Sequence, residues 1–120
     1  MTQPCDPCDD LDLGQAQAYA LDDESLDLLV DSYCQSLDQS LQDLQALRLS
    51  GDLIDWQQVL HALKGYIGLM AGAALRDLVT NTEALSRQGP LSALLTQVAQ
   101  IEPRLQALRE RLQGLRGRYH

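Results

Sequence analysis

The stretch LHALKGYIGLMAGAALRDLV, residues 60–79, decides the fold, because it predicts two amphipathic helical segments separated by a break. On a helical wheel at roughly 100° per residue, the large apolar side chains before the break fall on one arc, about 140° to 240° from His61. That arc contains Trp56, Val59, Leu63, Tyr66, Ile67 and Met70. Ala71 and Gly72 form the predicted break, because glycine tolerates a tight reversal of the chain. The stretch therefore predicts a helical hairpin with one buried face.

Apolar residues also recur at three- and four-residue spacing on both sides of this hairpin. They predict a short helix over residues 11–20 and longer helices over 23–50, from 52 or 55 to 70, over 73–87 and over 90–115. Four long amphipathic helices with short connections are typical of an up-down bundle. We therefore predict an all-α protein, an antiparallel up-down four-helix bundle with a short extra N-terminal helix.

Aspartates and prolines mark the ends of these helices. Asp22 opens an acidic run that is expected to cap the second helix and stay solvated, and either Asp52 or Asp55 caps the third. Pro90 is expected to lie in the first turn of the last helix, where proline is favoured. Pro103 lies inside that helix and is expected to kink or divide it.

The composition fits one helical domain. The 120 residues contain no Phe, and 45% of them are apolar. Residues 1–10 have no periodic apolar pattern, so we expect a tail there and a bundle domain over residues 11–120. Cys5 and Cys8 have the spacing of half a zinc site, but a structural site needs four ligands. We expect reduced thiols and no bound metal.

The charge distribution excludes several classes of partner. The net charge is −8, with 13 acidic groups and one basic group in residues 1–60, and 4 acidic and 8 basic groups in residues 61–120. No basic arm is present for nucleic acid, and no apolar run approaches the roughly 18 residues of a membrane span. The first residues do not form a secretion signal, and the chain has no phosphate loop for ATP. We expect a cytoplasmic monomer whose partner is a protein.

A histidine, a lysine and two glycines share the polar face of the hairpin's first helix. Relative to His61, Gly65 falls near +40°, Lys64 near −60° and Gly68 near −20° on a wheel of roughly 100° per residue. Each glycine weakens a helix by roughly 1 kcal/mol relative to alanine. Close packing of another helix could explain small residues, but Lys64 on the same face disfavours that alternative. The pattern favours a landing area for a partner protein.

These residue types suit transfer of a phosphoryl group. Imidazole is largely uncharged at neutral pH, so it can attack an electrophile without a separate base. Lys64, one turn from His61, can neutralise the charge that spreads over the phosphoryl oxygens. A helical histidine without such neighbours is more often a structural or surface residue.

The stretch 60–79 resembles the histidine phosphotransfer (HPt) family, whose pattern is a histidine followed by Leu-Lys-Gly, small residues, an apolar-Gly-small step and a leucine-spaced helix. In that family the histidine accepts a phosphoryl group from a receiver-domain aspartate and returns it to another. The resemblance implies that His61 is the phosphoacceptor, that Lys64 stabilises charge, and that Gly65 and Gly68 leave room for the partner.

Two positions depart from the family's pattern. Tyr66 and Ile67 stand where the family often has Ser or Ala, which should alter the packing of the core. Gly72 comes one place later than the glycine of the apolar-Gly step, which should alter the turn. Neither change removes the reactive group.

The hairpin also places a candidate partner for His61 on its second helix. His61 precedes Gly72 by 11 residues and Glu83 follows it by 11, so both lie roughly 16 Å from the turn. The family commonly has a Gln or Glu there that accepts a hydrogen bond from the imidazole, and the resemblance implies this role for Glu83. Arg87, one turn further, is a candidate for a second charge near the phosphoryl group. The alternative is an ordinary surface ion pair between Glu83 and Arg87.

The resemblance implies a phosphocarrier in a multistep two-component phosphorelay, which forms a phosphohistidine intermediate and is not a stand-alone enzyme. Response-regulator receiver domains are the implied partners, and a hybrid sensor kinase is a further candidate. Mg²⁺ is expected on the receiver, and no cofactor on this chain. We expect docking around the helix of His61, with Leu60 and Leu69 as apolar rim residues.

Two alternatives come from other classes of protein. The first is a non-catalytic helical adaptor that binds a receiver or kinase without being phosphorylated. The second is a metal-dependent module that uses Cys5 and Cys8. Labelling of His61 by a phosphorylated receiver distinguishes the carrier from the adaptor, and zinc analysis tests the metal module.

Overall fold

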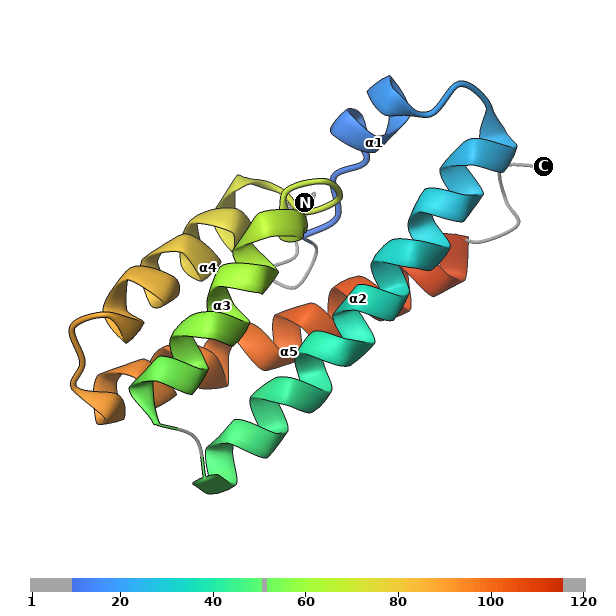
Figure 1. Cartoon of the computed structure of the whole chain (residues 1–120). Coiled ribbons are helices and arrows are strands. Elements are labelled where there is room, and N and C mark those ends of the chain that lie inside the picture. Colours follow the sequence, from blue (N-terminus) through green and yellow to red (C-terminus); the bar gives the residue numbers. More distant parts are fainter. Residues whose placement is uncertain (1–9, 51, 116–120) are drawn as a thin grey trace, which may run out of the picture.

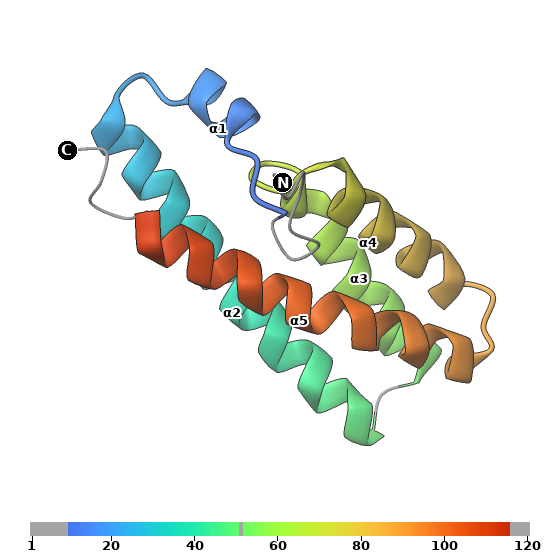
Figure 2. The ribbon, with the colours of Figure 1, turned by 180° about the vertical axis from the view of Figure 1, so that it is seen from behind.

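Four long helices pack side by side in the computed structural model of the chain, and a short fifth helix precedes them (Figure 1). The structure describes residues 10–50 and 52–115, and the helices within them are α1 (Gly14–Tyr19), α2 (Asp23–Ser50), α3 (Leu53–Ile67), α4 (Ala73–Ser86) and α5 (Leu91–Leu115). Helices α2 and α4 each pack against both α3 and α5, so the four form a closed ring. Neighbouring helices run antiparallel, as the view from behind also shows (Figure 2). The predicted all-α antiparallel bundle is confirmed.

Helix α2 begins where its capping aspartate was predicted. The Asp22 carboxylate accepts a hydrogen bond of 2.8 Å from the backbone N–H of Ser25, which satisfies one of the donors left open in the first turn. This backbone hydrogen bond and one from the Ser25 side chain lower the pKa of Asp22. The predicted apolar positions of α2 face the core, and its buried members are Leu26, Val30, Tyr33, Leu37, Leu41 and Leu44.

Helix α3 is capped by Asp52, whose side chain accepts a hydrogen bond of 3.0 Å from the backbone N–H of Asp55. Of the two predicted caps, Asp52 is therefore the one used. The helix ends at Ile67, three residues before the predicted end near Met70. Beyond Ile67 the backbone pairs with the segment before α1, since the carbonyl of Met70 accepts a hydrogen bond of 2.9 Å from the backbone N–H of Asp12.

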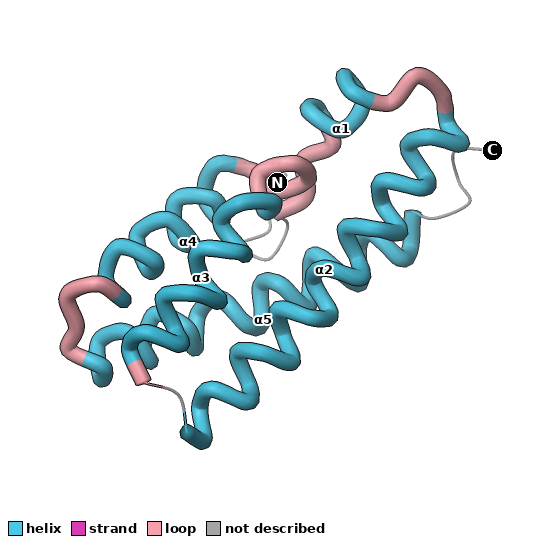
Figure 3. The backbone as a smooth tube through the Cα atoms, viewed as in Figure 1, coloured by secondary structure: helices cyan, strands magenta, loops and turns pink. Residues whose placement is uncertain are grey.

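The segment before α1 lies against the turn between α3 and α4, and both are drawn as loop in Figure 3. Leu11 and Ala71 form an antiparallel bridge, and the backbone N–H of Gly72 donates to the carbonyl of Asp10 at 2.8 Å. The helix predicted over residues 11–20 is accordingly shorter, since the first of these residues pair with the turn.

Asp10 corrects the predicted tail of residues 1–10. Its side chain is buried, and Arg104 of α5 donates two hydrogen bonds to it, at 2.9 and 2.5 Å. Asp10 therefore packs as part of the bundle. Residues 1–9, with Cys5 and Cys8, lie outside the described residues.

Helix α5 is continuous through Pro103, so of the two predicted outcomes, a kink or a division, the division is wrong and the kink stays a prediction. Proline removes the hydrogen bond to the carbonyl of Ala99, four residues earlier. Both residues are exposed, so water can hydrate that carbonyl and the helix continues. At the other end, Pro90 precedes the first residue of α5 instead of lying in its first turn, and its carbonyl accepts from the backbone N–H of Leu94 at 3.2 Å.

No helix within the described residues combines the length and the apolar character that crossing a membrane requires.

Candidate functional site

Helix α3 separates a buried face from an exposed one, as its wheel predicted. Trp56 and Leu63 are fully buried, and Ile67 is nearly so. On the opposite side, the side chain of His61 is 73% exposed. The imidazole is thus accessible to another protein while the rest of the helix is anchored in the core.

Leu60 corrects the predicted docking rim. Its side chain is fully buried in the core, so it cannot contact a partner on the surface. On the wheel Leu60 lies roughly 260° from His61, just beyond the predicted apolar arc, and packing of the neighbouring helices extends the core to include it. Leu69 is partly buried and packs against the core cluster, and its role at a docking surface stays a prediction.

Tyr66, one of the two departures from the family pattern, ties α3 to α2. Its hydroxyl donates to the carbonyl of Ser36 at 3.0 Å and lies 2.6 Å from the Ser40 hydroxyl. Tyr33 packs edge-on against the Tyr66 ring, with centroids 5.4 Å apart, and donates to the carbonyl of Ile67 at 2.8 Å. Burial raises the pKa of Tyr66 to about 12, so the phenol stays a neutral donor. The anchor lies on the side of α3 away from His61.

Glu83 of α4 lies beside His61, as the residue count from the turn predicted. Its Oε2 atom is 3.7 Å from Nδ1 of His61, close enough for an ion pair and longer than the roughly 3.2 Å limit of a good hydrogen bond. The Glu83 side chain is 2% exposed and that of His61 is 73% exposed. The carboxylate therefore faces the imidazole from below the surface.

Three basic side chains surround the Glu83 carboxylate. Lys64 Nζ lies 3.7 Å from Oε1, and Arg87 donates a hydrogen bond of 2.5 Å to Oε2. Burial alone would raise the pKa of Glu83. The hydrogen bond from Arg87 and the charges of Arg87, Lys64 and His61 outweigh it, and the pKa lies below its ordinary value. Glu83 is therefore ionised at neutral pH, and its carboxylate attracts the side chains of Lys64 and Arg87.

Gly65 of α3 and Gly68, which caps the C-terminus of that helix, differ in their surroundings. A Cβ atom built on Gly65 meets nothing within 4 Å, whereas one built on Gly68 lies 3.0 Å from Cδ of Arg76. Gly65 is thus bare toward solvent, and Gly68 is covered by an α4 side chain. We did not predict Arg76 from the sequence, although its spacing of seven residues from Glu83 places both on one face of α4.

Other candidate chemistry is limited. Cys34 is buried in α2 and forms no disulfide among the described residues. Within residues 10–50 and 52–115, no group of three or more His, Cys, Asp or Glu side chains could hold a metal ion. Cys5, Cys8 and His120 lie outside this part of the chain, so the metal-dependent alternative stays a prediction.

The charges of the site suit a transferred anion. One carboxylate, Glu83, is matched by the two permanent cations Lys64 and Arg87, which leaves an excess positive charge beside the imidazole of His61. Positive charge that is fixed in place stabilises the spreading negative charge of a phosphoryl group in transfer.

An α-helical bundle with an accessible histidine among basic side chains is the arrangement of a phosphotransfer module. A family model described as the Hpt domain matches residues 28–116, and the chain therefore belongs to the Hpt domain family. Hpt domains are phosphotransfer modules of phosphorelays and interact with response-regulator receivers in two-component systems. Comparisons with curated proteins and with solved structures gave no match.

Proposed function

We propose that His61 accepts a phosphoryl group from the aspartate of one receiver domain and passes it to the aspartate of another. The observation that carries the proposal is the orientation of the ring, whose Nδ1 faces the buried carboxylate of Glu83 at 3.7 Å while the side chain is 73% exposed. A proton on Nδ1 then stays toward Glu83, and the lone pair of Nε2 points outward.

The transfer needs no separate base. Nε2 of the neutral ring forms a bond to phosphorus, and the bond between phosphorus and the aspartyl oxygen breaks as the carboxylate of the receiver leaves. The ring keeps its proton on Nδ1 and gains a positive charge, which the Glu83 carboxylate offsets. Lys64 and Arg87 supply positive charge near the phosphoryl oxygens. The return step to a second receiver reverses these bonds.

The metal ion that phosphoryl transfer needs is assigned to the partner in this proposal. We propose that Mg²⁺ enters on the receiver, that this chain binds no ATP or cofactor, and that the protein acts as a cytoplasmic monomer. A hybrid sensor kinase is a further candidate as the source of the phosphoryl group. Gly65 provides room for the receiver, because no atom lies within 4 Å of a Cβ built at that position.

Labelling with a phosphorylated receiver domain and Mg²⁺ tests the proposal. The wild-type chain should acquire an acid-labile phosphoryl group, and His61→Gln should reduce the labelling by more than about 100-fold, since His61 is the imidazole that lies beside Glu83 and its cations Lys64 and Arg87. His120→Gln is the matched control, because it removes the other histidine of the chain, and it should label like the wild type. Equal labelling of His61→Gln and wild type would overturn the assignment. A receiver that binds the wild type without labelling it would favour the helical adaptor.

A further inference from the structure

Gly68 is not bare toward solvent, although it shares the face of His61. The side chain of Arg76 from α4 lies across it, with Cδ 3.0 Å and Cγ 3.7 Å from the position of an added Cβ. A Cβ contact of 3.0 Å is closer than normal packing, so an alanine at position 68 would push this part of Arg76 away. The missing side chain of Gly68 therefore lets Arg76 lie closer to the end of α3 than an alanine would.

Arg76 also differs from the other arginines near the bundle's interfaces. Arg48, Arg87, Arg104 and Arg109 each pair with a carboxylate. Among the described residues, the exposed guanidinium of Arg76 has no ion-pair or hydrogen-bond partner. Its charge is thus available to another molecule.

The helix registers place this charge next to the phosphotransfer site. Arg76 precedes Glu83 by seven residues on α4, and Gly68, the helical C-cap of α3, follows His61 by seven. Both spacings amount to about two turns, so each pair lies on one helix face, roughly 10 Å apart along the axis. Arg76 therefore lies toward the α3–α4 turn from His61, and Arg87 lies on the other side.

We propose that Arg76 is a docking residue for the receiver and that Gly68 positions the Arg76 side chain by leaving room for it. Its guanidinium recognises acidic side chains on the receiver surface beside the phosphorylated aspartate. This proposal rests on the function proposed above and adds a specific contact to it. Arg76 does not reach the reacting atoms, so its effect falls on association with the receiver and not on the chemical step.

Replacement of the charge gives the first test. Arg76→Gln should raise the KM for a phosphorylated receiver about fivefold and leave the maximal rate of transfer unchanged. The fall in kcat/KM with added salt should also be less steep in this variant. Labelling by phosphoramidate, a small phosphoryl donor that needs no docking surface, should not change. Arg111→Gln, which removes the same charge from the exposed surface of α5, is the control and should keep the wild-type KM.

Gly68→Ala, made in the wild type and in Arg76→Ala, gives the second test. If Gly68 positions Arg76, the alanine should raise KM several-fold in the wild type and have no further effect in Arg76→Ala, which lacks the Cγ and Cδ atoms. An equal effect in both backgrounds would show that the receiver contacts Gly68 directly and would overturn the positioning role.

Other outcomes separate this proposal from the function on which it rests. An unchanged KM in Arg76→Gln overturns the docking role, and a lowered Tm with unchanged KM shows that Arg76 only stabilises the C-terminus of α3. If phosphorylated receivers do not label the wild type at His61, the proposed function itself fails. If the wild type is labelled normally and Arg76→Gln matches it in KM and salt dependence, only the docking role fails.

Discussion

Two edges of the bundle use charge in opposite ways. Along the edge where α2 and α5 pack, carboxylates and guanidinium groups pair one to one across the interface. Arg48 of α2 pairs with Glu102 of α5, and Asp38 of α2 pairs with Arg109 of α5. Each of these two pairs is balanced, so this edge offers little charge to another molecule.

Along the edge where α3 and α4 pack, one carboxylate forms ion pairs with several basic side chains. Glu83 is buried and contacts Lys64, Arg87 and His61, while Arg76 lies on the same edge without a partner among the described residues. The excess positive charge stays on the surface. Ion pairs at the α2–α5 edge thus join helices, whereas the charges at the α3–α4 edge leave a positive surface that suits the proposed docking of a receiver.

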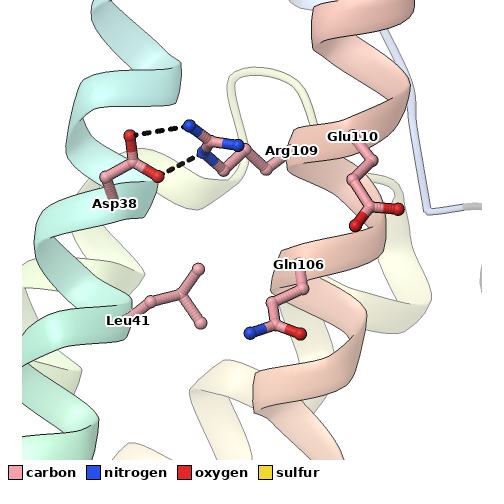
Figure 4. A pocket seen from close by; sticks show the side chains of 5 residues that line it. All are labelled: Asp38, Leu41, Gln106, Arg109 and Glu110. Carbon is pink, nitrogen blue, oxygen red and sulfur yellow. Dashed lines mark hydrogen bonds and ion pairs between the residues drawn. The ribbon is translucent and has the colours of Figure 1, made fainter.

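The shape of the α2–α5 edge supports this contrast. A groove there is lined by Asp38, Leu41, Gln106, Arg109 and Glu110. In Figure 4 the Asp38–Arg109 pair spans the gap between the two helices, and Glu110 points outward from α5. Two of the three charged groups that line this groove, Asp38 and Arg109, pair with each other and connect α2 to α5.

The largest expected effect comes from filling the open position at Gly65. Gly65→Leu should lower kcat/KM for transfer from a receiver by roughly 100-fold, because the side chain keeps the receiver out of line with His61. Gly65→Ala should slow transfer less and stabilise the protein by up to about 1 kcal/mol, since alanine favours a helix and nothing lies within 4 Å of its Cβ. Receiver kinetics and thermal unfolding measure the two effects.

Gly114 provides a matched control for this experiment. It also lies in a helix, α5, with nothing within 4 Å of a built Cβ. Gly114→Leu should leave transfer unchanged. Equal loss of transfer in the two leucine variants would contradict a special role for the α3–α4 edge.

Local sequence patterns were sufficient to predict most of the fold and part of the site. Three- and four-residue spacing predicted the long helices, and the equal distance of His61 and Glu83 from Gly72 predicted their proximity. These features depend on helix geometry, which repeats along the chain and can be counted.

Contacts between residues far apart in the sequence could not be predicted in this way. Asp10 pairs with Arg104 across 94 positions, and Leu11 bridges Ala71, so neither contact has a local sequence signal. Burial of Leu60 depends on how the neighbouring helices pack beside α3. Spacing places Arg76 on the face of Glu83, but only the structure shows it covering Gly68.

A smaller effect is expected when Glu83 loses its charge. Glu83→Gln should slow transfer about tenfold, because a neutral amide offsets the charge of the phosphorylated ring less well. At pH 7 it should also cost on the order of 1 kcal/mol of unfolding free energy, since the hydrogen bond from Arg87 is no longer charged on both sides and Arg87 is half exposed.

The pH dependence of stability checks this interpretation. The folded-state pKa of Glu83 lies below its ordinary value of 4.5, so its stabilising contribution is present above that value and is lost as the pH falls through the folded pKa. The Tm of wild type should exceed that of Glu83→Gln at pH 7, and the gap should close on acidification below 4.5. A gap that is independent of pH would mean that the carboxylate charge does not stabilise the fold.

The smallest effect is expected at the α2–α5 edge. Asp38 and Arg109 are both partly exposed, at 42% and 31%, so solvent screens their attraction. Asp38→Asn and Arg109→Gln should each lower Tm by about 3 °C or less. The double variant should resemble the single ones, because either substitution already breaks the pair.

Transfer from a receiver should stay within about twofold of wild type, since this pair joins α2 to α5 and does not face His61. A strong loss of transfer without loss of stability would place part of the receiver surface on the α2–α5 edge and end the distinction between the two edges.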